Sequence, residues 1–290
     1  MSEIVKVENV SDTALWVANY RAQESMRPDG LFKDPLAEKL VGERGKQLAA
    51  LLGSAEILSW IMVVRTVAID RLILKAIELG VDTIVNLGAG LDTRPYRMNL
   101  PTNLRWVEID FEHMIQFKNE KLIGEIPKCS LERISVDLSK INERREVFKK
   151  LGLETKSALI ITEGVIPYLS NEDAESLAKD IFAVANFKYW IQDFRNGGLK
   201  KRMPKRLLKK LKGAPFLFKA EKWIEFFENL GWKVMETISA LDEGERLGRP
   251  FPIPFPWNIV FKLMPGFMKA KALEELRAGT GFVLFQKQKK

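Results

Sequence analysis

The chain has 290 residues, of which 46% are hydrophobic, and its formal net charge is +8. This length suits one doubly wound α/β domain with a cap. The lone cysteine, Cys129, excludes an internal disulfide, the first residues lack a signal peptide's apolar core, and no apolar run approaches the roughly 20 residues that span a bilayer. We therefore expect a cytoplasmic protein.

Residues 13–26 are predicted to form a helix, which belongs to an N-terminal helical cap over residues 1–55. One face of this helix is small and apolar except for Arg21. A guanidinium at such a position needs a partner. The partner is either a nearby acid or a bound ligand.

A longer helix is predicted over residues 55–79, where hydrophobic residues recur at helical spacing and Gly80 provides the C-terminal cap. The apolar stripe contains one arginine, Arg65. Breaking a buried ion pair costs about 3–5 kcal/mol, so this guanidinium requires a partner. Both the carboxylate of Glu163 and the carboxylate of a ligand fit its bidentate geometry.

A strand, a tight turn and a helix entry are predicted from residue 83 onward. The apolar run 83–87 suits a buried parallel strand, and it ends in the turn Gly88-Ala89-Gly90, where backbone N–H groups can approach a ligand closely. The next strand, 105–109, ends in Asp110, whose carboxylate can accept both hydroxyls of a ribose. Dinucleotide enzymes share this arrangement but carry a third glycine where this chain has Thr93.

Three more predicted strands are each followed by an acid. These are strand 133–136 with Asp137, strand 158–162 with Glu163 and strand 189–192 with Asp193. The carboxyl ends of parallel strands meet at one edge, so we expect these acids and Asp110 to line a ligand-binding rim, although an acid also commonly caps the helix that follows it. An acidic rim suits a cationic adenosine cofactor better than a pyrophosphate. S-adenosylmethionine, a sulfonium, is such a cofactor.

The sequence resembles the leucine carboxyl methyltransferase family in four motifs, which are NLGAGLDTR at 86–94, VEID at 107–110, VDL at 136–138 and TEGVIPYL at 162–169. It is also similar to the bacterial branch often called polyketide (TcmP-like) O-methyltransferases. The residues shared with this branch are RAQES at 21–25, Asp34-Pro35 and Arg65-Thr66. The resemblance covers about residues 13–193.

The resemblance implies that S-adenosylmethionine is the methyl donor. The implied donor contacts are Arg21 and Arg65 at the methionine carboxylate, Gly88, Ala89 and Gly90 at the methionine end, Asp110 at the ribose, Asp137 and Leu138 at the adenine, and Glu163 at the rim. Residues 163–169 are expected to form the methyl-transfer pocket, with Tyr168 beside the reactive methyl group.

The acceptor side of the expected site is less defined. Arg97 is predicted, with Tyr168, to serve catalysis by neutralising an acceptor carboxylate, but Arg94 and Arg97 can equally pair with the rim acids. His113, the single histidine, is expected on a helix surface. A carboxylate acceptor needs no general base, so this scarcity of bases is compatible with carboxyl O-methylation. It does not exclude a phenol deprotonated by Tyr168 or an acid.

The last third of the chain is predicted to form helices at 171–186 and 220–230 and strands at 233–238 and 281–286. Residues 195–212 contain nine basic residues, no acid and interleaved leucines, which predicts a basic amphipathic helix. Residues 249–257 include four prolines, which exclude regular structure, and open an apolar insertion that continues to residue 268. We expect residues 195–275 to form an acceptor lid, with transient membrane contact as the alternative for the basic helix and the apolar insertion.

These observations predict one α/β domain with the class I S-adenosylmethionine-dependent methyltransferase fold, a seven-stranded, mostly parallel Rossmann-like sheet with a helical cap. We expect an O-methyltransferase that acts on a carboxylate, or a hydroxyl, of a small apolar metabolite, with no nucleic-acid partner and no metal. The alternatives are a carboxyl methyltransferase of a protein C-terminus, a nicotinamide (NAD-type) oxidoreductase, a nucleic-acid methylase and a non-enzymatic membrane-surface protein.

Overall fold

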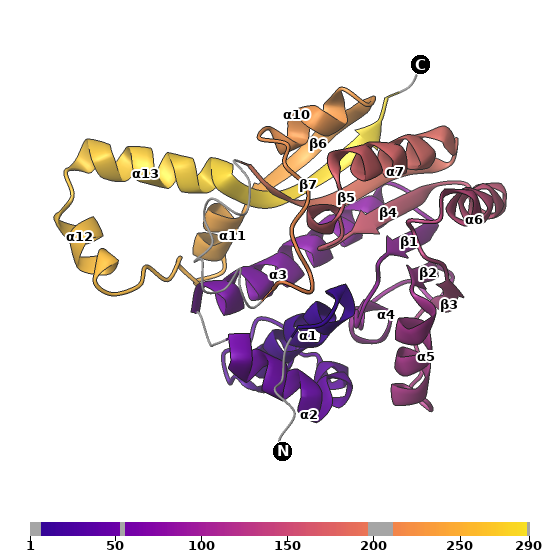
Figure 1. The fold of residues 1–290 in the computed structure, drawn as a ribbon, viewed down its shortest axis with the longest axis horizontal. Helices are drawn as coiled ribbons and strands as arrows, with labels where there is room; N and C mark the ends of the chain where they lie inside the picture. The colour runs from indigo at the N-terminus through magenta and orange to yellow at the C-terminus, as the bar shows by residue number, and fades with distance from the viewer. Residues whose placement is uncertain (1–6, 53–55, 197–210, 289–290) are drawn as a thin grey trace.

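A twisted seven-stranded sheet organises the computed structural model, which describes residues 7–52, 56–196 and 211–288 (Figure 1). The strand order is β3-β2-β1-β4-β5-β7-β6, with β7 antiparallel to β5 and β6 and the other pairs parallel. The strands are β1 (Thr83–Leu87), β2 (Arg105–Asp110), β3 (Ser130–Ser135), β4 (Ala158–Thr162), β5 (Phe187–Arg195), β6 (Trp232–Ser239) and β7 (Thr280–Lys287). The predicted seven-stranded, mostly parallel sheet is confirmed.

Helices cover both faces of the sheet. They are α1 (Val10–Met26), α2 (Pro35–Leu52), α3 (Glu56–Glu78), α4 (Arg94–Arg97), α5 (Glu112–Lys121), α6 (Ile141–Glu154), the 3-10 helix η1 (Ile166–Tyr168), α7 (Asn171–Ala183), α10 (Trp223–Glu228), α11 (Ala240–Arg246), α12 (Trp257–Leu263) and α13 (Gly266–Gly279). The core on one face contains α1 and α3, and the core on the other contains α6, α7 and α10.

The central strands are short and apolar because both of their faces are covered. Every residue of β1 and β4 is buried, as expected for the inner strands of a parallel sheet. The stripe of α3, including Ile69 and Leu72, belongs to the same core as Ile84 and Trp106 of the sheet. The helix predicted at 55–79 is therefore confirmed as α3, with its apolar face on the sheet.

The helices α1 and α2 pack on each other and form a cap beside the carboxyl ends of the strands (Figure 1). Small side chains on α1, Ala18 and Ala22, are buried together with Leu40 of α2 and Leu91 after the glycine turn. This packing fixes the N-terminal part of α1 over the end of the sheet.

Two strands differ from their predicted bounds by more than one residue at an end. The edge strand β3 begins at Ser130 and ends at Ser135, so Asp137 lies two residues beyond it. Strand β5 continues through Asp193 to Arg195, because β7 pairs with it antiparallel as far as Arg195↔Thr280. Most of the predicted basic helix, residues 197–210, lies outside the described residues.

Residues 249–256 contain no helix or strand, as their prolines predicted, and they lead into α12 and α13. These two helices extend from the body of the molecule, and α13 returns the chain to β7 (Figure 1). Within the described ranges, no helix is long and apolar enough to cross a membrane.

Candidate active site

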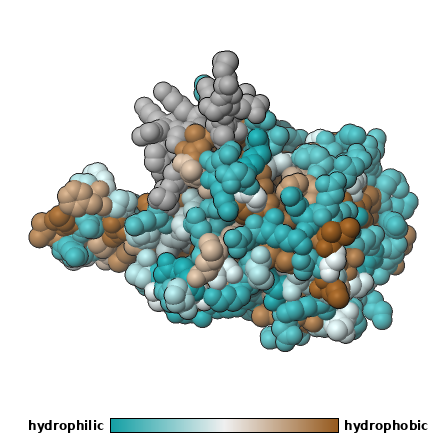
Figure 2. All heavy atoms as spheres, turned by 90° about the horizontal axis from the view of Figure 1, so that it is seen from below, coloured by the Kyte–Doolittle hydropathy of each residue, from teal (hydrophilic) through white to brown (hydrophobic). Residues whose placement is uncertain are grey.

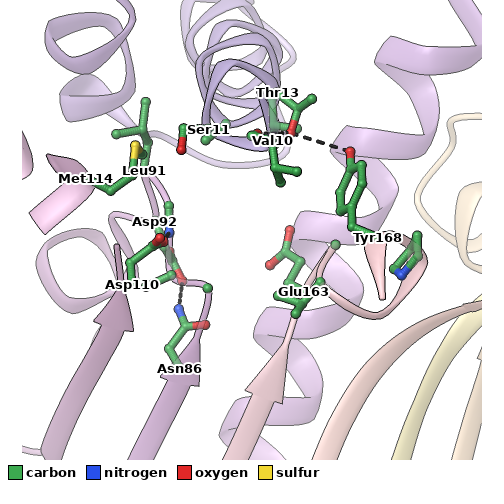
Figure 3. Close-up of a pocket in the computed structure, with 18 of the residues that line it drawn as sticks. Val10, Ser11, Thr13, Asn86, Leu91, Asp92, Asp110, Met114, Glu163 and Tyr168 are labelled. Carbon is green, nitrogen blue, oxygen red and sulfur yellow. Dashed lines mark hydrogen bonds between the residues drawn. The ribbon is translucent and has the colours of Figure 1, made fainter. Parts of the chain in front are cut away.

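A cavity of about 360 Å³ lies at the carboxyl ends of the parallel strands, under the first turns of α1. Figure 3 shows Asp110 and Asp92 on one side of it, Glu163 and Tyr168 on the other, and Thr13 of α1 above them. The cavity is thus lined by residues of the N-terminal cap and of the strand ends. A cavity of this size suits a small ligand.

The four acids that follow the predicted strands are brought together at this cavity. Asp110, Asp137, Glu163 and Asp193 all line it. The common rim predicted from the order of the strands is therefore present, although β5 ends later than expected and Asp193 lies within the strand.

The glycine turn is bound directly to the acid at the end of β2. Gly88 and Gly90 have φ values of 63° and 48°, which favour glycine. The N–H of Gly90 donates a 2.6 Å hydrogen bond to Asp110 Oδ2, and the N–H of Phe111 donates a 2.7 Å bond to Asp110 Oδ1. Turn and carboxylate therefore form one preorganised unit.

Alanine at Gly88 is expected to weaken donor binding by about tenfold or more, equivalent to about 1.4 kcal/mol. Its Cβ would lie 2.6 Å from Cγ2 of Val165, a stiff β-branched residue, and the turn would have to move.

Gly80→Ala is the matched control, because Gly80 also has positive φ but a Cβ there meets nothing within 4 Å. Both variants carry backbone strain of about 1–2 kcal/mol. Calorimetry with S-adenosylhomocysteine should detect the affinity loss in Gly88→Ala alone, and equal losses in both variants would contradict a special role for Gly88.

The acids divide into two electrostatic groups. Among the described residues, Asp110 and Asp137 have no salt-bridge partner, and Asp137 instead accepts hydrogen bonds from Ser139. Glu163 and Asp193 are paired with arginines. The rim is therefore negative at the Asp110 end and balanced at the Glu163 end, which differs from the uniformly acidic rim that the strand order suggested.

Both arginines predicted to hold the donor carboxylate line the cavity, and both already have acidic partners. Arg21 Nε lies 2.9 Å from Asp34 Oδ2, and Arg21 also donates to the carbonyl of Leu91. Arg65 Nε lies 2.8 Å from Glu163 Oε1 without the alignment of a hydrogen bond, so this buried N–H has no acceptor among the described residues. Arg65 thus keeps a free donor beside the cavity, whereas Arg21 mainly joins the cap to the glycine turn.

The arginines after the turn differ in position. Arg94 lines the cavity, and its Nη1 atom lies 2.7 Å from Glu163 Oε2 and 2.9 Å from Asp92 Oδ2. Arg97 is absent from the residues that line this cavity, and it forms a bidentate pair with Asp70 at 2.6 and 2.8 Å. The pair with Asp70 corresponds to one of the two alternatives expected for Arg97, and its catalytic role stays a prediction.

Tyr168 lies on the same side of the cavity as Glu163 (Figure 3). Its hydroxyl is 3.4 Å from Thr13 Oγ1, and its ring stacks on Phe216 with centroids 5.2 Å apart. Burial raises the pKa of Tyr168, so the phenol is protonated at neutral pH and acts as a hydrogen-bond donor. His113 instead pairs with Ser11 near the surface and does not line this cavity.

Arg195 is a charged residue of the cavity that was not among the predicted site residues. It lies at the end of β5, lines the cavity and, within the described part of the chain, forms no ion pair or hydrogen bond through its side chain. Burial lowers the pKa of its guanidinium, and the charge of Asp193 only partly offsets this. Arg195 was expected as the first residue of the basic segment and of the acceptor lid, and its place on β5 was missed because the end of β5 is determined by pairing with β7, about 85 residues later in the chain.

Two structural observations indicate that the residues of this cavity fit S-adenosylmethionine. Burial raises the pKa of Asp110, and its two N–H partners leave lone pairs that ribose hydroxyls can use. The Nε of Arg65 lies near Glu163 but makes no aligned hydrogen bond among the described residues, so its N–H can donate to a carboxylate. Asp110 would then hold the ribose and Arg65 the methionine end, with Asp137 and Leu138 lining the adenine side of the cavity.

Comparisons with known proteins agree with this geometry. The family model for leucine carboxyl methyltransferase matches residues 14–182, more than half of the chain. An inferred S-adenosyl-L-methionine-dependent methyltransferase from Parafrankia sp. is 37% identical over 182 residues, which cover 59% of this chain and 58% of the relative. A relative of the same description from Frankia alni is 29% identical over 263 residues, which cover 83% and 90%.

Two solved structures share the fold. A DUF574 family protein from Streptomyces avermitilis aligns with a TM-score of 0.58 and 12% identity over 93% of this chain and 97% of that one. An inferred methyltransferase from Thermobifida fusca aligns with a TM-score of 0.57 and 14% identity over 99% and 97%.

The sheet has the order and the mostly parallel strands of the class I S-adenosylmethionine-dependent methyltransferases, and its glycine turn is hydrogen-bonded to the carboxylate that ends β2. The chain belongs to the leucine carboxyl methyltransferase family. The resemblance found in its sequence is confirmed.

Proposed function

We propose that this chain is an S-adenosylmethionine-dependent O-methyltransferase whose acceptor is the carboxylate of a small apolar molecule, held by Arg195. The observation that carries the proposal is that Arg195 lines the cavity while its guanidinium has no ion-pair partner among the described residues. We further propose that the enzyme acts in the cytoplasm, in keeping with its single cysteine.

Arg195 differs from the other arginines of the cavity in its charge balance. Arg21 has Asp34, and Arg65 and Arg94 share Glu163. A partly buried guanidinium without such a partner is costly, and an anionic ligand would relieve the cost. A carboxylate fits best, because it accepts two parallel N–H bonds from arginine.

The rest of the acceptor end is apolar, which supports a hydrophobic acceptor body. The lining side chains there include Trp16, Val17, Leu58, Met62 and Phe216. Helices α1 and α3 provide the first four, so the cap helps to shape the acceptor space. Burying apolar surface adds about 25 cal/mol per Å² to binding.

The titratable groups favour a carboxylate over a hydroxyl acceptor. When bound, S-adenosylmethionine supplies an electrophilic methyl group on a sulfonium. A carboxylate is already ionised at neutral pH and needs no proton transfer. Tyr168 has a raised pKa and Glu163 is bound by Arg65 and Arg94, so both are poor general bases. The chain therefore contributes by aligning the reactants and excluding water.

Transfer of a radiolabelled methyl group into cell extract tests this proposal. The expected product is small, extractable into organic solvent and loses its label under mild base, as an ester does. Label that resists base would indicate a hydroxyl acceptor, and label that stays with protein would indicate a protein C-terminus. Either result would overturn the proposal.

Arg195→Gln is expected to lower kcat/KM for the acceptor by about 100-fold, since two charge-assisted hydrogen bonds are worth about 3 kcal/mol or more. Affinity for S-adenosylhomocysteine should not change, and Arg195→Lys should restore part of the activity. Arg145→Gln, at a largely exposed arginine on α6, is the control. Lost S-adenosylhomocysteine affinity with unchanged acceptor KM would assign Arg195 to the donor carboxylate instead.

A further inference from the structure

Among the described residues, many of the exposed large apolar side chains lie together on one projection of the molecule. We call residues 255–273 the C-terminal arm, which contains α12 and the first half of α13. No residue of α12 is buried, and Trp257, Leu263 and Phe267 are 65%, 80% and 77% exposed. Figure 2 shows this projection standing out from the body, with hydrophobic surface at its tip. Such exposure marks an interaction surface.

The C-terminal arm does not cover the cavity. The residues that line the described cavity include Arg195 and Phe216 but none of residues 249–268. The acceptor lid expected from residues 195–275 therefore receives no contribution from the apolar insertion at this cavity. The insertion needs another explanation.

The base of the arm is anchored while its tip is free. Trp60 Nε1 donates a 2.7 Å bond to the carbonyl of Arg249, and the ring of Trp60 meets Phe251 edge to face. At the other end, Arg277 Nε lies 2.6 Å from Asp242 Oδ1 on α11. These contacts hold both ends of the segment on the body, so the arm presents its tip at a fixed place.

The charge of the arm has one sign. Residues 255–273 contain no Asp or Glu, and the basic residues among them are Lys262, Lys269 and Lys271. Exposed tryptophan, phenylalanine and leucine beside lysines are typical of segments that lie in the interface of an anionic membrane. A second copy of this arm would bring the same positive charge to a symmetric contact.

We propose that the C-terminal arm docks on an anionic lipid surface, with its aromatic and aliphatic side chains in the interfacial layer and its lysines against the headgroups. The docking is peripheral, because the helices α12 and α13, of 7 and 14 residues, are each shorter than the roughly 20 residues that span a bilayer. It is independent of the acceptor chemistry at the cavity. It places the enzyme where apolar acceptors concentrate.

Sedimentation with vesicles tests the proposal on the full chain. The probe is a vesicle of about seven parts phosphatidylcholine to three parts phosphatidylglycerol, with pure phosphatidylcholine for comparison. We expect binding at least tenfold stronger to the anionic vesicles, weakened when salt rises from about 0.1 M to about 1 M and the screening length falls from about 10 to about 3 Å. Trp257→Asp combined with Phe267→Asp should reduce anionic binding at least tenfold.

The matched control combines Ile126→Asp with Leu153→Asp. These side chains are 86% and 82% exposed but lie outside the arm, and Leu153 belongs to α6, at the opposite end of the molecule from α12 (Figure 1). All variants should retain S-adenosylhomocysteine affinity, which reports on folding. Vesicle binding that survives the arm substitutions, or no preference for anionic lipid in the parent, would overturn the proposal. A concentration-dependent dimer that the arm substitutions abolish, without vesicle binding, would assign the arm to a second copy.

Discussion

Asp110→Ala is expected to weaken S-adenosylhomocysteine binding by about two to three orders of magnitude, since hydrogen bonds to a charged group contribute about 1.5–3 kcal/mol each and a ribose offers two hydroxyls. The carboxylate is buried and preorganised, because the N–H groups of Gly90 and Phe111 fix both of its oxygens. Its removal also releases the glycine turn. Titration calorimetry measures the loss directly.

Glu112→Ala provides the control for Asp110→Ala. Glu112 is an exposed acid two residues later, in the first turn of α5, and it does not line the cavity. Its substitution should leave the affinity unchanged within about twofold, a difference of about 0.4 kcal/mol. An Asp110→Ala protein that binds as tightly as the parent would remove Asp110 from the donor site.

Glu163→Ala is expected to lower the free energy of unfolding by about 3–5 kcal/mol, the usual cost of breaking a buried ion pair. Glu163 is the common partner of Arg65 and Arg94, at 2.8 and 2.7 Å, and its side chain is only 13% exposed. Without it, two buried guanidiniums lose their shared counter-charge. Urea unfolding of the parent and the variant measures the difference.

The control for Glu163→Ala is Glu132→Ala. Glu132 pairs with Arg105 at 2.6 Å, but its side chain is 40% exposed. A surface pair of this kind contributes about 0–1 kcal/mol. Equal losses of unfolding free energy in the two variants would show that burial at the cavity adds nothing to the stability contributed by the Glu163 pair.

The stability supplied by Glu163 should also depend on pH. Burial raises the pKa of Glu163, but attraction to Arg94 and Arg65 outweighs burial and brings the pKa below its ordinary value of 4.5. A carboxyl group with a lowered pKa in the folded state stabilises the fold above its ordinary pKa, and the contribution is lost as the pH falls through the folded value. The difference in the free energy of unfolding between the parent and Glu163→Ala should therefore be largest at neutral pH and should shrink below pH 4.5.

The predictions from the sequence were most accurate for elements whose structure depends on residues nearby in the chain. Strands β1 and β4 have the predicted bounds, because a buried parallel strand is a short apolar run that can be recognised without its neighbours. The stripe of α3 identified Arg65 as a buried arginine in need of an acid, and Glu163 was one of the two partners proposed. The edge strand β3 was harder, since its residues are half-buried or exposed and carry no clear pattern.

Features fixed by distant parts of the chain could not be predicted. The end of β5, and with it the position of Arg195, depends on antiparallel pairing with β7. Arg97 has the same local sequence signals as Arg94, and Asp70 on α3 binds both, yet only Arg94 also pairs with Glu163 and lines the cavity. Hydrophobicity indicated a pocket or a membrane for residues 249–268 equally well, and the three-dimensional structure shows that these residues do not line the described cavity.

A crystal structure with S-adenosylhomocysteine would test the central claim most directly. We expect the ribose hydroxyls within hydrogen-bonding distance of Asp110, the adenine beside Asp137 and Leu138, and the sulfur directed toward the space bounded by Tyr168 and Arg195. Density for the adenosyl group elsewhere, or a ribose with no contact to Asp110, would contradict the account.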